Sequence, residues 1–153
     1  MTAAGLAARA RGHYTRSEFM TVCRWKTPRS GPKVASNSAS AIRVATRRAF
    51  VTTDPAEQMA TLLALAGVGV PTASVLLHFA FPESLPILDV RALESLGVTG
   101  RSSYTPAFWA HYADACRELA SANGVSLRTL DKALWQYSKE CDDFASRPGS
   151  KPT

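Results

Sequence analysis

Hydrophobic side chains recur along this chain at intervals of three and four residues, the spacing that places them on one face of an α-helix. Residues 38–50 follow this pattern, and so do residues 126–137, where Tyr137 is the last inward position that we expect. No segment keeps the strict alternation of polar and apolar residues that indicates a β-strand. The pattern therefore predicts an all-α protein.

Polar caps and prolines mark where these helices should begin. Thr15 and Glu18 have the spacing of a capping box, in a helix that must stop before Pro28. Asp54 and Pro55 form a cap followed by a proline in the first turn. Further helix starts are expected at Ser38, Pro71, Asp89, Thr105 and Ser126. These starts predict a compact bundle of about seven helices.

The length of 153 residues is that of one compact domain. Residues 1–13 are small and basic, and we expect a disordered N-terminus there. Residues 27–37 hold two prolines and one glycine, which favours a loop. Residues 145–153 are expected to form a disordered tail. The folded domain is therefore predicted to span residues 14–144.

Charge is distributed unevenly along the chain, whose overall net charge is +6. Residues 1–50 hold ten basic side chains and one acidic side chain, a net charge of +9. Residues 51–153 hold eight basic and eleven acidic side chains, a net charge of −3. Such asymmetry indicates a polyanionic partner for the first third, most simply DNA. The alternative is a charged surface that serves solubility alone.

The three cysteines, Cys23, Cys116 and Cys141, lie far apart and form no CxxC pair. This spacing argues against a disulfide framework, a zinc finger and an iron–sulfur cluster. No apolar run approaches the roughly 18 residues that a membrane span requires. We therefore expect a cytoplasmic protein that has no membrane partner.

The most informative segment is a Gly67-Val68-Gly69 turn between two predicted helices. Backbone amides at the start of a helix attract a phosphate without the help of any side chain. A dinucleotide-binding loop does not fit, because Thr72 stands where its third glycine would be and a helix precedes the turn. A P-loop does not fit either, since no Gly-Lys-Ser/Thr follows. A plain helix–helix turn remains the alternative.

The residues around this turn resemble a known family. Residues 65–73 are Leu-Ala-Gly-Val-Gly-Val-Pro-Thr-Ala, and residues 86–89 are Pro-Ile-Leu-Asp. Together they resemble the helix-hairpin-helix (HhH-GPD) DNA glycosylase superfamily, which includes endonuclease III and the alkyladenine glycosylases. The resemblance covers residues 60–97, about a quarter of the chain. It implies a DNA-glycosylase-like bundle around a helix-hairpin-helix motif.

The resemblance also implies roles for individual residues. In the family, hairpin amides hold DNA phosphates, often with a monovalent cation at the hairpin backbone, and no other cofactor is expected here. The matching DNA-binding positions are Gly67, Val68, Gly69, Val70 and Thr72. Asp89 follows Gly69 by 20 residues and matches the active-site aspartate. Its carboxylate would stabilise the sugar cation or activate water, a role that can coexist with capping a helix.

Several positions depart from the family pattern. Pro71 stands where bifunctional members carry the lysine that forms a Schiff base, so lyase chemistry is excluded at that position. Ala66 replaces the usual proline, and the four-cysteine cluster motif of the endonuclease III branch is absent. The chain is also shorter than a complete glycosylase of this type, so a protein partner could complete the site.

A second cluster of candidates combines aromatic and basic residues. Lys26, Arg29 and Lys33 would contact phosphates beside Trp25. Trp25 and Tyr104 are the aromatic candidates for a base pocket, although Trp25 could instead anchor the core. Arg91, close to Asp89, could contact a phosphate or pair with an acid. A solvated basic face is the alternative interpretation of the cationic residues.

These observations favour a monofunctional N-glycosylase that excises a modified or mispaired base from DNA in base excision repair. Such an enzyme hydrolyses an N-glycosidic bond and has no Schiff-base lyase activity. One alternative is a non-catalytic DNA-binding helix-hairpin-helix module. Another is a helical adaptor that binds a protein, in which the basic first third serves solubility.

Overall fold

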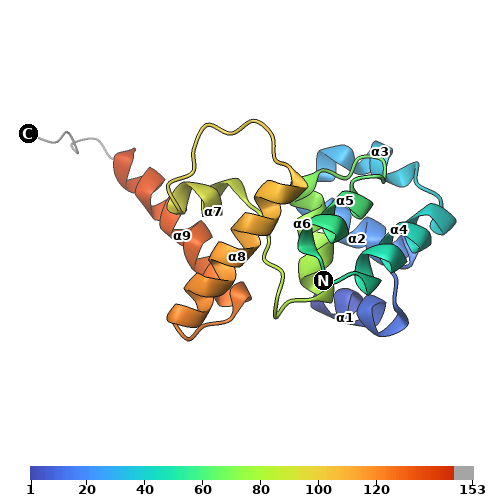
Figure 1. Cartoon of the computed structure of the whole chain (residues 1–153). Helices are drawn as coiled ribbons and strands as arrows, with labels where there is room; N and C mark the ends of the chain where they lie inside the picture. Colours follow the sequence, from blue (N-terminus) through green and yellow to red (C-terminus); the bar gives the residue numbers. More distant parts are fainter. Residues whose placement is uncertain (147–153) are drawn as a thin grey trace, which may run out of the picture.

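A computed structural model describes residues 1–146, and every regular element in that range is helical (Figure 1). The first six α-helices are α1 (Thr2–Arg11), α2 (Arg16–Lys26), α3 (Gly31–Ala35), α4 (Ala39–Val51), α5 (Pro55–Leu62) and α6 (Val70–Ala80), with a 3-10 turn, η1 (Pro28–Ser30), before α3. The last three are α7 (Val90–Ser95), α8 (Pro106–Ala122) and α9 (Leu127–Ala145). The prediction of an all-α protein is confirmed.

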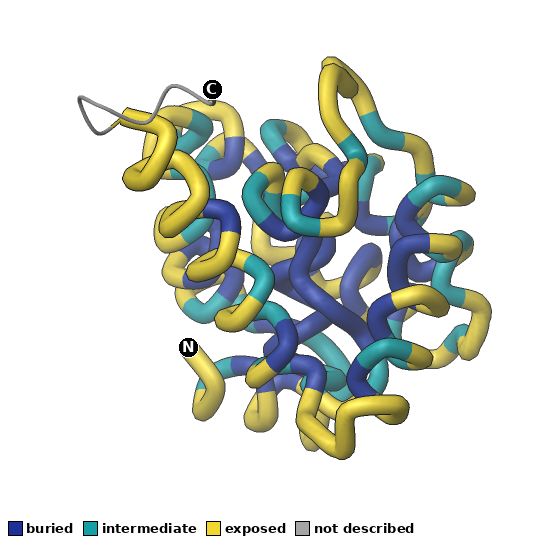
Figure 2. The backbone as a smooth tube through the Cα atoms, turned by 90° about the vertical axis from the view of Figure 1, so that its left-hand side faces the viewer, coloured by how far each residue is buried: buried dark blue, intermediate teal, exposed yellow. Residues whose placement is uncertain are grey.

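Helix α6 is the centre of the N-terminal half. Each of its residues is buried except Pro71, which is partly buried, and α1, α2 and α5 pack around it. In the other half α7 packs on α9, and α8 joins the two halves through contacts with α5 and α9 (Figure 1). The buried backbone forms a continuous interior under an exposed outer layer (Figure 2). One hydrophobic core therefore runs through both halves.

The predicted caps form as expected. Thr15 and Glu18 make a reciprocal capping box at the start of α2. Asp54 caps α5, and Ser126 accepts a hydrogen bond from a first-turn amide of α9. Glu18 also pairs with Arg11, and the hydrogen bond from that guanidinium lowers the pKa of Glu18 to about 2. Local polar residues thus fix the ends of these helices.

The prediction of a disordered N-terminus over residues 1–13 is wrong. Residues 2–11 form α1, and the side chain of Ala8 is completely buried. A Cβ at Gly5 would lie 2.0 Å from the carbonyl oxygen of Phe79, so α1 and α6 meet backbone against backbone. Small residues carry little hydrophobic signal, yet they permit this close approach.

Three further predictions need correction. Residues 27–37 are not simply a loop, because they include η1 and α3, whose prolines stand in first turns where no amide is required. Tyr137 is 60% exposed rather than inward. Ala145 is the last residue of α9 and Ser146 caps it, whereas the rest of the predicted tail, residues 147–153, lies outside the described residues.

Within residues 1–146 no helix is both long and apolar enough to cross a membrane. The same residues contain no group of three or more His, Cys, Asp or Glu side chains that could hold a metal ion.

Candidate functional site

The predicted hairpin turn lies between the end of α5 at Leu62 and the start of α6 at Val70. Gly67 has φ +73°, a backbone conformation that other L-residues seldom adopt. A Cβ at Gly67 would lie 2.9 Å from the backbone nitrogen of Val34 and 2.9 Å from the Cβ of Lys33. Helix α3 therefore packs directly against the turn, and only glycine fits there.

An asparagine side chain just after α3 also holds the turn. The Nδ2 group of Asn37 donates to the Ala66 carbonyl at 2.9 Å, and its Oδ1 atom accepts from the Ala66 amide at 2.9 Å. Asn37 is buried, and its Nδ2 group also donates to the Val34 carbonyl. This paired contact holds the turn against the chain that follows α3. Nothing in the local sequence pattern singled out Asn37.

Fewer of the predicted phosphate-binding residues are exposed than the sequence suggests. Gly69 is exposed, and no side chain caps the first turn of α6. The side chains of Val68 and Val70 are buried, and the Val68 amide donates to the Leu65 carbonyl. Thr72 is buried, and its hydroxyl lies 3.0 Å from that of Thr27. The backbone at Gly69 is thus the part of the hairpin that an incoming phosphate would meet.

A monovalent cation at the hairpin would need free carbonyl oxygens in the turn. The carbonyls of Leu62, Leu65 and Ala66 each already accept a hydrogen bond within the chain. Each carbonyl oxygen has a second lone pair, so a monovalent cation at the turn stays a prediction.

The segment that carries Asp89, residues 85–89, is a strap between α6 and α7 that is buried up to Leu88 and partly exposed at Asp89. Three buried side chains bind its backbone: Tyr112 donates to the Ile87 carbonyl (2.9 Å), His78 contacts the Leu85 carbonyl through Nδ1 (2.7 Å), and Ser74 accepts from the Leu88 amide (2.9 Å). Burial lowers the pKa of His78, so the ring is neutral and donates its Nδ1 proton to that carbonyl. The strap is therefore held at three successive points before Asp89.

Both oxygens of Asp89 have partners. Oδ1 accepts from the Arg91 amide at 3.0 Å, which makes Asp89 the N-cap of α7 as the sequence indicated. Oδ2 lies 2.7 Å from Nζ of Lys26 at the end of α2. The Asp89 side chain is 27% exposed, and that of Lys26 is 16% exposed. The strap, the cap and the ion pair together fix the direction of this carboxylate.

Asp89 and Lys26 line a cleft of about 470 Å³, a volume within the usual range of small-molecule sites. Its walls come from the end of α2, the strap and the first half of α9. The other lining residues are Trp25, Ile87, Arg128, Asp131, Lys132, Trp135 and Gln136. The cleft thus joins the predicted cluster around Lys26 to α9, for which the sequence predicts a packing role alone.

Two tryptophans give this cleft accessible aromatic surface. Trp25 is 48% exposed and packs edge-on against Phe79, with ring centroids 5.6 Å apart. Trp135 is 41% exposed, and the guanidinium of Arg91 lies 5.6 Å from its ring centroid. Trp25 is therefore not a buried core anchor. Nζ of Lys139 also lies 5.4 Å from the Trp135 ring centroid, and a planar group entering the cleft would meet the indole surface that remains exposed.

A second carboxylate, Asp131 on α9, also lines the cleft. Its side chain is only 12% exposed and lies 2.5 Å from Nη1 of Arg128. Burial raises the pKa of Asp131, and the negative charge of Asp89 raises it further, against the opposing effects of Arg128 and Lys26. No sequence motif marks Asp131, because it meets Asp89 only through the packing of α9.

The remaining candidates divide between the hairpin and other surfaces. Lys33 is exposed beside the hairpin turn and Arg29 is exposed in η1. Arg91 pairs with Asp142 of α9 at 2.9 Å, which is the acid-pairing alternative that the sequence left open. Tyr104 stacks on Phe108, at 5.6 Å between centroids, and is not among the residues that line the cleft.

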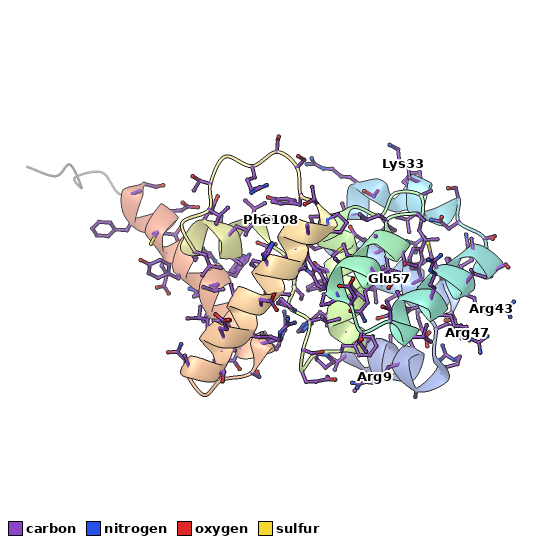
Figure 3. The ribbon with its side chains drawn as sticks, viewed as in Figure 1. Arg9, Lys33, Arg43, Arg47, Glu57 and Phe108 are labelled. Atoms are coloured by element: carbon purple, nitrogen blue, oxygen red, sulfur yellow. The ribbon has the colours of Figure 1, made fainter. Side chains whose placement is uncertain are left out.

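The four basic side chains that Figure 3 labels do not lie together. Figure 3 shows Lys33 at the upper edge of this half, whereas Arg43 and Arg47 project from α4 at its side. Arg9 projects from α1 at the lower edge, where it pairs with Glu83. These four cations therefore lie at separate places on the N-terminal half, and Lys33 lies against the hairpin turn.

Comparisons with models of known protein families, with curated proteins and with solved structures found no match to this chain.

Proposed function

We propose that this protein is a monofunctional DNA N-glycosylase, in which the hairpin binds the DNA backbone and Asp89 acts on the sugar of a base turned into the cleft. Cleavage of the N-glycosidic bond builds positive charge on the deoxyribose. A carboxylate that already points at the reacting atom stabilises that charge without having to reorganise. Base excision repair is the process in which such an activity would serve.

The fixed position of Asp89 is the observation that carries this proposal. The strap before it is bound by Ser74, His78 and Tyr112, and its own two oxygens are both engaged. These bonds satisfy the buried backbone of the strap and at the same time fix the carboxylate at the edge of the cleft. The cleft beside it also offers aromatic surface, which suits a base that has left the stack.

Lys26 has to release Asp89 for this chemistry, because its ammonium competes with the sugar cation for the carboxylate. In the proposal a DNA phosphate attracts the ammonium as the DNA binds, and the freed Oδ2 atom then faces the sugar. The position that carries the lyase amine in bifunctional relatives is Pro71, which has none. The proposed reaction therefore ends with an intact strand and an abasic site.

The test is base release from duplexes that each carry one uracil, alkylated, oxidised, deaminated or mismatched base. We expect the wild type to leave an abasic site that hot alkali cleaves, and Asp89→Asn to be about 10²–10³-fold slower. Asp143→Asn, an exposed change on α9, is the matched control and should act like the wild type. Strand cleavage without alkali would contradict the monofunctional assignment.

One observation favours a second candidate, a DNA-binding module without turnover. The Lys26 ammonium neutralises Asp89 at 2.7 Å, as it would if that carboxylate served only to join α2 to the strap. Salt-dependent DNA binding together with no base release from any duplex would identify this alternative.

A further inference from the structure

The cleft brings together two carboxylates from different parts of the chain, and the proposed function uses only one of them. Asp89 stands on the strap before α7, whereas Asp131 stands on the second turn of α9. Both line the same cleft, and the charge of one acts on the protonation of the other. The two differ in surroundings: Asp89 pairs with an ammonium and a backbone amide, and Asp131 is the more deeply buried.

We propose that Asp131 is the general acid of this cleft, which protonates the departing base while Asp89 faces the sugar. The proposal rests on the glycosylase function above. Pairs of carboxylates with unlike surroundings divide the acid and the charge-stabilising roles in glycoside hydrolysis. Here the two acids reach the cleft from separate elements, the strap and α9, so that a base and its sugar can be contacted by different groups.

The groups around Asp131 act on its pKa in both directions, and burial, which raises the pKa, is the largest effect. Burial raises the pKa of this carboxyl, and Asp89 adds to the effect from the strap. Arg128 on the same helix and Lys26 from α2 act in the opposite direction. From α8, Tyr112 and Cys116 face Asp131, and both hold their protons because burial raises their pKa values.

The proposed step balances as a hydrolysis. The bond between C1′ and the base nitrogen breaks, and its electron pair stays with the base. Asp131 donates its proton to the base, and water adds its oxygen to C1′. The proton lost by that water restores the carboxyl of Asp131, so the products are the free base, an abasic sugar and the starting protein.

This assignment also indicates a class of substrate. A neutral base leaves poorly unless it is protonated, and a general acid contributes about 10²–10⁴-fold to such a step. A purine that is methylated on a ring nitrogen, such as 7-methylguanine, already carries a positive charge and gains nothing from the acid. The cleft is therefore suited to neutral bases, such as uracil, hypoxanthine or a mispaired adenine.

The experiment compares Asp131→Asn with the wild type on duplexes that carry a neutral base or 7-methylguanine. We expect release of the neutral base to fall about 10²-fold or more, with release of 7-methylguanine and the Kd for DNA unchanged. Thermal unfolding checks that the variant folds, because the change replaces the carboxylate that pairs with Arg128 by a neutral amide of the same size. Asp143→Asn, on an exposed position of the same helix, is the control.

A pH profile separates acid catalysis from a structural role. The rate at which the wild type releases the neutral base should fall as pH rises and Asp131 loses its proton. The rate for Asp131→Asn should lack this falling limb of the pH profile. Arg128→Gln should move the limb to higher pH, because loss of the guanidinium favours the protonated acid.

Three outcomes would overturn the inference. If the wild type releases the neutral base and Asp131→Asn does so equally fast, Asp131 is not the acid although the glycosylase function stands. If the wild type releases only 7-methylguanine, the assignment of neutral substrates is wrong. If the wild type releases no base at all, the proposed function fails and this inference fails with it.

Discussion

The hairpin turn and the Asp89 cleft are built in different ways. The hairpin is made from neighbouring residues, and its shape depends on a glycine at position 67 that α3 presses against. The cleft is made from three distant segments, and its shape depends on side chains that hold the strap. Helix α6 serves both, because its first turn follows the hairpin while Ser74 and His78 bind the strap. Changes on this one helix can therefore separate DNA binding from chemistry.

The largest effect on chemistry, apart from changes to the two carboxylates, is expected from Ser74→Ala. Its hydroxyl is the acceptor for the buried Leu88 amide, so the change leaves that amide without a partner and costs about 1–3 kcal/mol of stability. A shift of the strap would misplace Asp89, and we expect base release to fall about 10²-fold. Single-turnover release and chemical denaturation measure the two effects.

The control for this change is Ser84→Ala, which makes the same substitution one residue before the strap. We expect Ser84→Ala to keep both stability and base release. Equal rates for Ser74→Ala and the wild type would show that the strap does not need this hydrogen bond to position Asp89.

The next largest effect is expected to separate the two hairpin glycines. Gly67→Ala introduces a Cβ against the Val34 backbone at a positive φ and should destabilise the fold by about 1–3 kcal/mol. Gly69→Ala meets only Pro71, at an ordinary 3.8 Å, and should fold normally. Its methyl group would obstruct a phosphate at the exposed turn, so we expect DNA affinity to fall about tenfold.

Denaturation midpoints and DNA titrations test this pair. Unchanged DNA affinity in a folded Gly69→Ala protein would mean that the hairpin backbone does not contact DNA. The cleft could then still act on DNA, but the binding role proposed for the turn would be wrong.

The same division separates what the sequence predicts from what it does not. Capping residues, prolines and glycines act on their neighbours, so the starts of α2, α5 and α9 and the glycine turn before α6 could be predicted from local patterns. The N-cap role of Asp89 is equally local. The chemical role proposed for Asp89 comes from the family resemblance and not from its local pattern.

The cleft could not be predicted in this way, because its walls meet only in the folded chain. Asp131 and Trp135 look like ordinary members of an amphipathic helix until α9 packs beside the strap. Helix α1 escaped prediction for a related reason, since Gly5 contributes by being small and not by being hydrophobic. Local patterns report what a residue does to its neighbours, whereas these residues act across the fold.

A smaller effect is expected from the cation beside the hairpin. Lys33→Gln should reduce the slope of log affinity against log salt by about 1, because one phosphate contact is lost. Arg9→Gln is the control, since Arg9 lies on another edge and pairs with Glu83. A slope that changes equally in both variants would mean that the hairpin side has no special part in binding DNA.

The smallest effect concerns stability in mild acid. Burial lowers the pKa of His78 from its ordinary value of 6.5, so the unfolded chain takes up a proton more readily than the native protein does. The contribution of neutral His78 to the free energy of unfolding is therefore complete above about pH 6.5, and it is lost as the pH falls below that value. His78→Gln should flatten this dependence, and the exposed His111→Gln should keep it. Denaturation at pH 7.5 and 5.5 measures the difference.

The most direct test of the central claim is the single-turnover rate of base release by Asp89→Asn, at protein concentrations that saturate the duplex. If the cleft does the chemistry and the hairpin does the binding, this variant binds DNA at least as tightly as the wild type, because Lys26 no longer has to leave a carboxylate. It releases the base about 10²–10³-fold more slowly. In the same assay a saturating amount of Gly69→Ala releases the base at the wild-type rate. Release by Asp89→Asn at the wild-type rate would contradict the account.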